Sequence, residues 1–236
     1  AIRAIREDRN GYSLSAGVDP LHRSIRDHLR HDLGWDPNDP DIGIIVTSGT
    51  SGALLLAAMA LLDEGDEAII PDPWFVIYPQ LGPLTGGRMV GCDTYPDFRM
   101  TAERIEPLLT ERTKFVLLNS PGNPTGVVLD DEEVRRIAEL CRDRGVQLVS
   151  DEIYDEFVFP DSARPDGTCP SPGRFDESTL VIRGFGKTYG CTGWRLGYAA
   201  GPRWLVDQMV KLQQFTFVCA PTPLQWGVVS AFEHDN

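Results

Sequence analysis

The sequence predicts an α/β protein built on a mostly parallel β-sheet that helices cover on both faces, giving three layers. Short apolar runs of strand length alternate along the chain with stretches of helical length, which is typical of parallel strands joined by helices. The 236 residues, 42% of them hydrophobic, suit one large α/β domain with a sizeable core. In such sheets ligands bind beyond the carboxyl ends of the strands.

Each element follows from its residues, in chain order. Apolar runs predict strands at Ile44–Thr47, Glu67–Ile70, Arg88–Cys92, Lys114–Asn119, Val146–Ser150 and Thr179–Phe185. Helices are expected at about Ser51–Asp63, Ala102–Leu109, Asp130–Arg144 and Pro221–Asn236. Asp130 is expected to cap its helix, because three acidic residues follow it in the first turn, where the helix dipole favours carboxylates.

Composition excludes several classes of protein. With 22 Lys and Arg against 35 Asp and Glu, the net charge of −13 argues against nucleic acids and anionic membranes as partners. The longest apolar run, Ala53–Leu62, is too short to span a bilayer and predicts a buried helix. Five cysteines without a C-x-x-C pair predict reduced thiols in a cytoplasmic protein. His28 and His31 are expected on the surface of a helix, so no metal site is predicted.

Two small-residue segments follow predicted strands. Ser48–Ala53 opens a helix after the first strand, and its free backbone N–H groups and hydroxyls would suit a phosphate. A plain helix N-cap explains these residues at least as well. Ser120–Gly126 follows the fourth predicted strand and contains two prolines and two glycines, which indicate a rigid turn holding Asn123.

Charged residues follow the next two strands. Asp151 comes directly after a buried strand, with Tyr154 three residues on, and a buried acid is costly without a partner. Lys187 comes after the last predicted strand, and Arg195 follows it by eight residues. A nucleotide P-loop ending at Lys187 is excluded, because the glycine that it requires is Val181.

Taken together, three strings resemble the class I and II aminotransferases, which are fold-type I pyridoxal-phosphate enzymes. The strings are SPGNPTG, SDEIYDEF and GKTYGCTGWRLGY, in this order, and the resemblance runs from Tyr12 to about Pro223. It implies that residues 1–236 form the large, cofactor-binding domain of such an enzyme.

The resemblance implies roles for the residues at the strand ends. Lys187 would form the Schiff base with pyridoxal phosphate and move the proton during the reaction. Asp151 would pair with the pyridine nitrogen and keep it protonated. Tyr154 and Asn123 would donate hydrogen bonds to the phenolic oxygen of the cofactor.

Further roles concern the ring face and the phosphate of the cofactor. Phe75 matches the aromatic residue that stacks on the ring, with Trp74 as the alternative if the string is read one residue earlier. Thr50 and Ser51 would bind the phosphate, and Arg195 would supply a fixed positive charge.

The implied working unit is a homodimer with shared active sites. Tyr12 matches a tyrosine that reaches the phosphate bound by the neighbouring subunit, and about residues 1–35 are expected to pack across the dimer interface. The family's N-terminal segment and C-terminal small domain have no counterpart in the sequence. We therefore expect these 236 residues to be part of a longer polypeptide.

The implied function is ping-pong transfer of an amino group from an α-amino acid to a 2-oxo acid, in amino-acid metabolism. Another reaction of the same cofactor, such as carbon–sulfur lysis or decarboxylation, is the alternative, because these motifs are shared. A cofactor-binding regulator is less well supported, because the charge of −13 offers nothing to DNA. The motifs do not specify the donor amino acid.

The chain departs from the family pattern in front of the lysine. Gly184 and Gly186 stand where members of the family usually carry serine, and the first of these serines normally donates a hydrogen bond to the phosphate. A missing neutral hydrogen bond of this kind weakens binding by about 0.5–1.5 kcal/mol.

Overall fold

A seven-stranded sheet forms the centre of the protein in a computed structural model that describes residues 1–234. The strands lie in the order β1-β7-β6-β5-β4-β2-β3. Their bounds are Ile42–Thr47 for β1, Glu67–Asp72 for β2, Arg88–Asp93 for β3, Thr113–Asn119 for β4, Gln147–Asp151 for β5, Leu180–Gly184 for β6 and Gly197–Pro202 for β7. β1 to β6 run in one direction, and β7 runs antiparallel between β1 and β6. The predicted mostly parallel sheet is confirmed.

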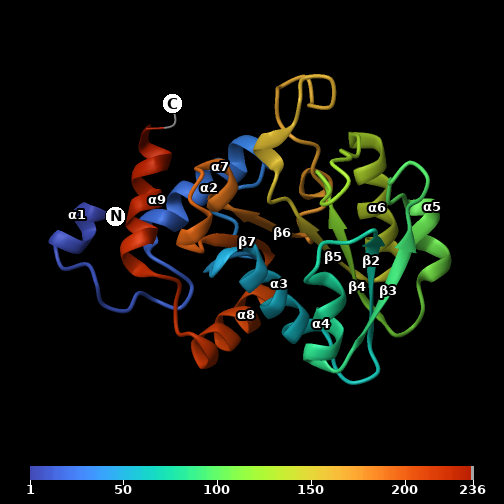
Figure 1. The fold of residues 1–236 in the computed structure, drawn as a ribbon, viewed down its shortest axis with the longest axis horizontal. Helices are drawn as coiled ribbons and strands as arrows, with labels where there is room; N and C mark the ends of the chain where they lie inside the picture. Colours follow the sequence, from blue (N-terminus) through green and yellow to red (C-terminus); the bar gives the residue numbers. More distant parts are fainter. Residues whose placement is uncertain (235–236) are drawn as a thin grey trace.

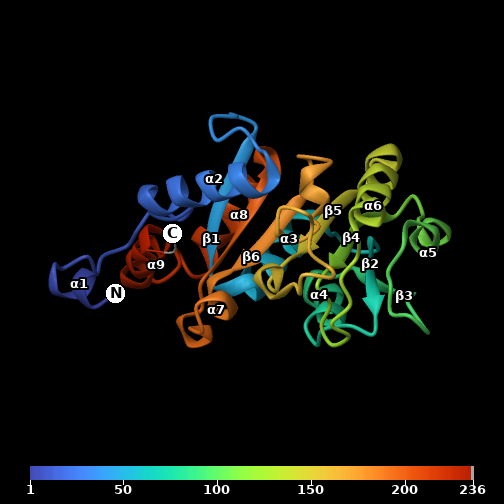
Figure 2. The ribbon, with the colours of Figure 1, turned by 90° about the horizontal axis from the view of Figure 1, so that it is seen from above.

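Helices cover both faces of this sheet (Figures 1 and 2). Their bounds are Ile2–Arg6 for α1, Asp19–Leu33 for α2, Gly49–Leu61 for α3, Tyr78–Thr85 for α4, Ala102–Ile105 for α5, Asp131–Arg144 for α6, Phe185–Thr188 for α7, Arg203–Thr216 for α8 and Thr222–His234 for α9. Side chains on β6 alternate between the faces: Leu180 and Ile182 join the core under α3 and α8, whereas Val181 joins the core under α2 and α9. Among residues 1–234, no helix has both the length and the apolar character that crossing a bilayer requires.

Local signals account for the helix ends. The Asp130 side chain caps α6 by accepting a hydrogen bond from the Glu133 backbone N–H at 2.9 Å, as predicted. α5 ends earlier than predicted, at Ile105, and continues as a 3₁₀ turn at Glu106–Leu108. Pro107 lies in this turn, and proline cannot continue α-helical hydrogen bonding.

The sequence did not predict β7, α4 or α8. β7 has the sequence GYAAGP, in which small residues and proline replace the β-branched residues that mark a strand. Its close contact with neighbouring backbones requires glycine at its start. A Cβ added to Gly197 would lie 2.9 Å from the backbone of Gly49 and Thr50, so glycine allows β7 to begin against the start of α3.

The N-terminal region divides into a packed helix and an exposed stretch. Leu21, Ile25 and Leu29 of α2 are buried against this chain's own sheet and α9. Before α2, the side chains of Ile2 and Tyr12 are exposed. Packing of this region across a dimer interface stays a prediction.

Candidate active site

A cavity of about 320 Å³ lies where β4, β5 and β6 end, beside the start of α3. It is lined by Gly49, Thr50, Ser51, Phe75, Tyr78, Asn119, Asn123, Asp151, Ile153, Tyr154, Gly186, Lys187, Thr192, Arg195 and Leu196. Every residue predicted for the site except Tyr12 belongs to this lining. The structure thus brings the predicted residues together, while their individual roles remain predictions.

Asp151 is the last residue of β5, and its carboxylate is almost fully buried at the cavity. Oδ2 accepts a hydrogen bond from the Tyr78 hydroxyl at 2.9 Å, and Oδ1 accepts one from the Ile153 backbone N–H at 3.3 Å. Burial raises the pKa of Asp151 to about 6, because these donors offset only part of the desolvation. A carboxylate buried with so little compensation is typical of a group that meets a cationic ligand.

Lys187 lies in α7, a single helical turn directly after β6. Its Nζ lies 5.4 Å from the centre of the Tyr154 ring, within the range of a cation–π contact. Because β5 and β6 are parallel neighbours, the segments after them bring the Lys187 amine, the Tyr154 phenol and the Asp151 carboxylate to one cavity. An amine, a phenol and a carboxyl together are suited to holding and moving protons.

The first turn of α3 borders another side of the cavity. Gly49, Thr50 and Ser51 form this turn and line the cavity. Backbone N–H groups at a helix N-terminus have no partner within the helix, and the helix dipole adds a partial positive charge there. The turn is therefore suited to an anionic group such as a phosphate.

Arg195 reaches the same turn from the segment before β7. A Cβ added to Gly49, which has a φ of +68°, would lie 2.7 Å from Nη2 of Arg195, so the guanidinium packs against this glycine. Nη1 of Arg195 also donates a hydrogen bond to the Thr192 carbonyl at 3.2 Å. A guanidinium beside a helix N-terminus makes this corner the cationic end of the cavity.

Asn119 was not predicted as a site residue. It is the last residue of β4, and its Nδ2 donates to the Asp151 carbonyl at 2.9 Å. Its Oδ1 accepts from the Asn123 backbone N–H at 2.8 Å. Asn119 therefore ties the loop that carries Asn123 to the end of β5. Its position at the carboxyl end of a predicted strand is the signal that could have identified it.

Phe75, rather than Trp74, lines the cavity, and Trp74 is 41% exposed. The Phe75 ring packs edge-on against Tyr78, with 5.8 Å between ring centres. Tyr78 is the second residue that the sequence did not predict for the site, although it lies in the same aromatic string. Burial and the neighbouring Asp151 raise the pKa of Tyr78, which keeps its hydroxyl protonated as a hydrogen-bond donor.

The two glycines before Lys187 lie in crowded surroundings. A Cβ added to Gly184 would lie 2.5 Å from Cδ1 of Ile153, and one added to Gly186 would lie 3.1 Å from Cα of Thr192. Ile153 therefore fills the space into which a serine at position 184 would project, and it would have to move to admit one.

Tyr12 lies outside the cavity, between α1 and α2, and is 86% exposed. Its predicted contact with a neighbouring subunit therefore stays a prediction.

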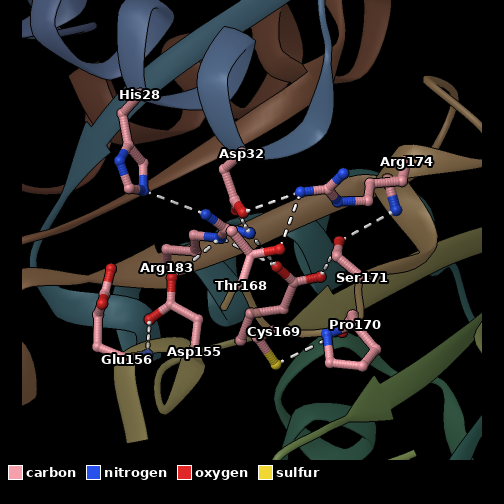
Figure 3. Close-up of polar contacts among 12 residues, drawn as sticks. His28, Asp32, Asp155, Glu156, Thr168, Cys169, Pro170, Ser171, Arg174 and Arg183 are labelled. Atoms are coloured by element: carbon pink, nitrogen blue, oxygen red, sulfur yellow. Dashed lines mark hydrogen bonds and ion pairs between the residues drawn. The ribbon is translucent and has the colours of Figure 1, made fainter. Parts of the chain in front are cut away.

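A buried group of charged residues lies on the α2 side of β6 (Figure 3). We call it the Arg183 cluster, and its members are His28, Asp32, Glu152, Asp155 and Arg183. His31 is exposed as expected, but His28 is half-buried, because α2 packs that side of the helix over Arg183. The surface position expected for His28 is therefore wrong.

His28 also approaches two carboxylates. The ligand atoms of His28, Asp155 and Glu156 lie within 4.8 Å of one another. However, Nη1 of Arg183 donates to His28 Nε2 at 3.2 Å, and a guanidinium at this distance opposes a metal cation there.

The sequence and the fold are similar to those of known proteins. A family model described as aminotransferase class I and II matches residues 2–236. The chain is 37% identical over 237 residues to a probable aspartate aminotransferase of Methanocaldococcus jannaschii, a match that covers 98% of this chain and 61% of that protein. It is 35% identical over 241 residues to a probable aspartate/prephenate aminotransferase of Aquifex aeolicus, covering 99% and 59% of the two chains.

Solved structures show the same fold. The aspartate aminotransferase from Thermus thermophilus with maleate matches with a TM-score of 0.91 and 33% identity, over 99% of this chain and 60% of that one. The aromatic aminotransferase from Pyrococcus horikoshii OT3 matches with a TM-score of 0.91 and 33% identity, over 98% and 62%. The chain thus spans about 60% of the length of the relatives that it matches.

Proposed function

The chain belongs to the class I and II aminotransferase family, and we propose that the protein uses pyridoxal phosphate to transfer an amino group from an α-amino acid to a 2-oxo acid. Enzymes of this class and fold use this cofactor. The observation that carries the proposal is that Lys187, Asp151 and Arg195 line one cavity at the carboxyl edge of the sheet. Nothing in the matches favours the lyase, decarboxylase or regulator alternatives.

The charged groups of the cavity fit this cofactor. When bound, pyridoxal phosphate supplies an aldehyde that condenses with amines and a pyridine ring that withdraws electrons. Asp151 is the buried anion that a protonated ring nitrogen requires. Arg195 and the first turn of α3, with Thr50 and Ser51, would hold the phosphate.

The remaining lining residues would orient the ring. Phe75 would pack on its face, while Asn123 and Tyr154 would hydrogen-bond the phenolic oxygen. Lys187 would carry the cofactor and hold or move the proton at the substrate Cα. Because the pKa of Asp151 is about 6, its carboxyl is ionised at neutral pH even without a cationic partner.

The test is covalent trapping on Lys187. Added pyridoxal phosphate should give a visible absorbance, and borohydride should fix the cofactor to the peptide that contains Lys187. Lys187→Ala should abolish this labelling, whereas Lys211→Ala, at an exposed residue of α8, should leave it unchanged. Equal labelling of wild type and Lys187→Ala would refute the assignment.

We also propose a homodimer with shared active sites, to which Tyr12 of one subunit contributes at the phosphate of the other. The exposed Ile2, Ile5, Tyr12 and Leu14 support this, because they offer apolar surface on one stretch of chain. Sedimentation of the purified protein should give twice the mass of one polypeptide. Tyr12→Phe should weaken binding of the cofactor without changing that mass.

A cytoplasmic location is proposed from the cysteines. All five lie within the described residues and none is paired. Cys92, Cys141 and Cys169 are buried, and burial raises their pKa values, which makes their thiols unreactive. Such thiols are typical of a reducing compartment.

The donor is proposed only as a class, an α-amino acid. Relatives are named for aspartate, prephenate and aromatic substrates, so family membership alone does not choose among them. A transamination panel that includes aspartate, glutamate and the aromatic amino acids would identify the donor.

A further inference from the structure

Arg183 is a fully buried cation that contacts several carboxylates at once (Figure 3). Its Nε donates a hydrogen bond to Oε2 of Glu152 at 2.9 Å and lies 3.2 Å from Oδ2 of Asp155. Its Nη2 lies 2.5 Å from Oδ2 of Asp32 on α2. Although burial alone would lower the pKa of Arg183, these carboxylates raise it, so the side chain stays charged.

Glu152 and Asp155 are the two ends of the turn that follows β5. Glu152 directly follows Asp151, and Asp155 directly follows Tyr154. The Asp155 backbone N–H donates to the Glu152 carbonyl at 3.1 Å, which closes the turn. Arg183 therefore binds both ends of a four-residue turn whose middle carries Ile153 and Tyr154.

The middle of this turn belongs to the cavity. The Ile153 N–H donates to the Asp151 carboxylate at 3.3 Å, and the Tyr154 ring lies 5.4 Å from the Lys187 amine. The other carboxylate oxygen of Glu152 is also held, because Oε1 accepts hydrogen bonds from the hydroxyls of Ser150 at 2.9 Å and Ser171 at 2.7 Å.

Fold stability alone does not require charges at these positions. A buried ion pair is often no more stabilising than apolar side chains of similar volume, because both charges must be desolvated. The chain offers a comparison in Glu67, a buried carboxylate that binds Arg88, Arg112 and Thr110. Glu67 begins β2, at the opposite edge of the sheet from the cavity.

We propose that Arg183 is a positioning residue for the proposed reaction: from the α2 side of the sheet it holds the turn 152–155, and through this turn it sets the positions of Asp151 and Tyr154 in the cavity. The inference rests on the proposed function. Arg183 does not line the cavity itself, so it acts through these two residues.

Loss of Arg183 has a definite direction of effect on Asp151. The charge of Glu152, which already raises the pKa of Asp151, would lose its counterion. A shift of the turn at its Asp155 end would also disturb the Ile153 N–H that stabilises the ionised carboxylate. Both changes favour the protonated form of Asp151 and weaken its hold on a cationic ring nitrogen.

The experiment uses two readouts on the full-length protein. The titration of the Asp151 carboxyl carbon is followed by NMR in the ligand-free protein, and the dissociation constant of pyridoxal phosphate is measured by absorbance at neutral pH. We expect Arg183→Met to raise the Asp151 midpoint by about one pH unit and to weaken cofactor binding about tenfold. Arg183→Lys, which keeps the charge but lacks the fork that bridges Glu152 and Asp155, should give an intermediate result.

Glu67→Gln is the matched control, because it removes a buried, paired charge that is remote from the cavity. It should change both readouts by less than about twofold, even if it lowers stability as much. If Arg183→Met does not fold, Arg183→Lys against Glu67→Gln decides the question. Unchanged readouts in the Arg183 variant, or equal changes in the control, overturn the inference.

Failure of the proposed function would look different. A wild-type protein that does not bind pyridoxal phosphate would contradict that function. The Asp151 titration in the ligand-free protein would still decide whether Arg183 positions the carboxylate.

Discussion

Asp151 on β5 and Arg183 on β6 are buried charges on neighbouring strands, and their surroundings differ. Asp151 accepts hydrogen bonds from a phenol and one backbone N–H, and burial raises its pKa to about 6. Arg183 meets three carboxylates. Although burial alone would raise the pKa of Asp32, Arg183 lowers it. A buried cation enclosed by carboxylates of the fold supports the framework, whereas a buried anion held by neutral donors indicates where a ligand binds.

The largest effect on stability is expected from removing Arg183. Arg183→Met would leave Glu152 and Asp155 without their cation and Asp32 with Arg174 alone, which should lower the free energy of unfolding by about 3–5 kcal/mol. Denaturant unfolding of the ligand-free protein measures this. Arg144→Met removes an exposed pair with Glu106 and should cost at most about 1 kcal/mol. Similar losses in the two variants would show that the Arg183 cluster is not the stronger interaction.

Removing the charge of Asp151 should instead affect turnover. Asp151→Asn keeps the shape of the side chain but removes the anion proposed to hold the ring nitrogen protonated. We expect kcat to fall by about 10²–10³-fold, the usual effect of removing one preorganised electrostatic group. Steady-state transamination by the full-length protein is the measurement. Near-normal turnover would mean that Asp151 is not the partner of the ring.

The pH dependence of unfolding sharpens the comparison. The folded-state pKa of Asp151 is raised from 3.8 to about 6. The folded state therefore binds more protons, and stability should fall as pH rises between about 4 and 6. Asp151→Asn should remove this loss, so that the ligand-free variant is more stable than wild type by about 3 kcal/mol above pH 6. Denaturant unfolding at a series of pH values tests it.

Asp32 should show the opposite pH dependence of stability. Folding lowers the pKa of Asp32. Its ionised carboxylate therefore stabilises the protein above the pKa of the unfolded state, and this stabilisation is lost as the pH falls through the pKa of the folded state. Asp32→Asn should therefore be less stable than wild type at neutral pH, and the difference between their free energies of unfolding should become smaller in acid. If the difference in free energy of unfolding from wild type changed with pH in the same direction for Asp151→Asn and Asp32→Asn, the distinction between the two sites would be contradicted.

The smallest effect is expected at the exposed edge of the cavity. Arg195→Lys keeps one positive charge but loses the fork that fits a phosphate, so the dissociation constant of pyridoxal phosphate should rise about tenfold. Absorbance titration measures it, and Arg136→Lys on α6 serves as the control. Equal affinity in Arg195→Lys and wild type would remove Arg195 from the phosphate site.

Local signals made much of the site predictable. The residues after each strand are close in sequence to a recognisable apolar run, and parallel strands bring their carboxyl ends to one edge. This is why Asn123, Asp151 and Lys187 were found together. β7 was missed because neighbouring backbones require its glycines, which have low strand propensity.

The Arg183 cluster was not predictable for a different reason. Asp32 and Arg183 are far apart in the sequence and meet only because α2 packs over β6. Neither residue belongs to a local pattern that indicates the other. The half-buried position of His28 was missed for the same reason, since helical spacing alone does not show which side of α2 will meet a buried cation.

The antiparallel direction of β7 has a consequence for the order in which the site assembles. Lys187 and Arg195 lie in the loop that joins β6 to β7, so pairing these two adjacent strands closes only a short loop. The first turn of α3 joins them only when β1 pairs with β7, for example Thr47 with Gly197, across about 150 residues. Contacts between residues so far apart in the sequence slow folding, because the entropy of loop closure is lost before the strand contacts contribute favourable free energy. We expect the β6–β7 hairpin to gain protection from hydrogen exchange during refolding before β1 does, so that the amine and the guanidinium are in place before the helix that completes the anion site.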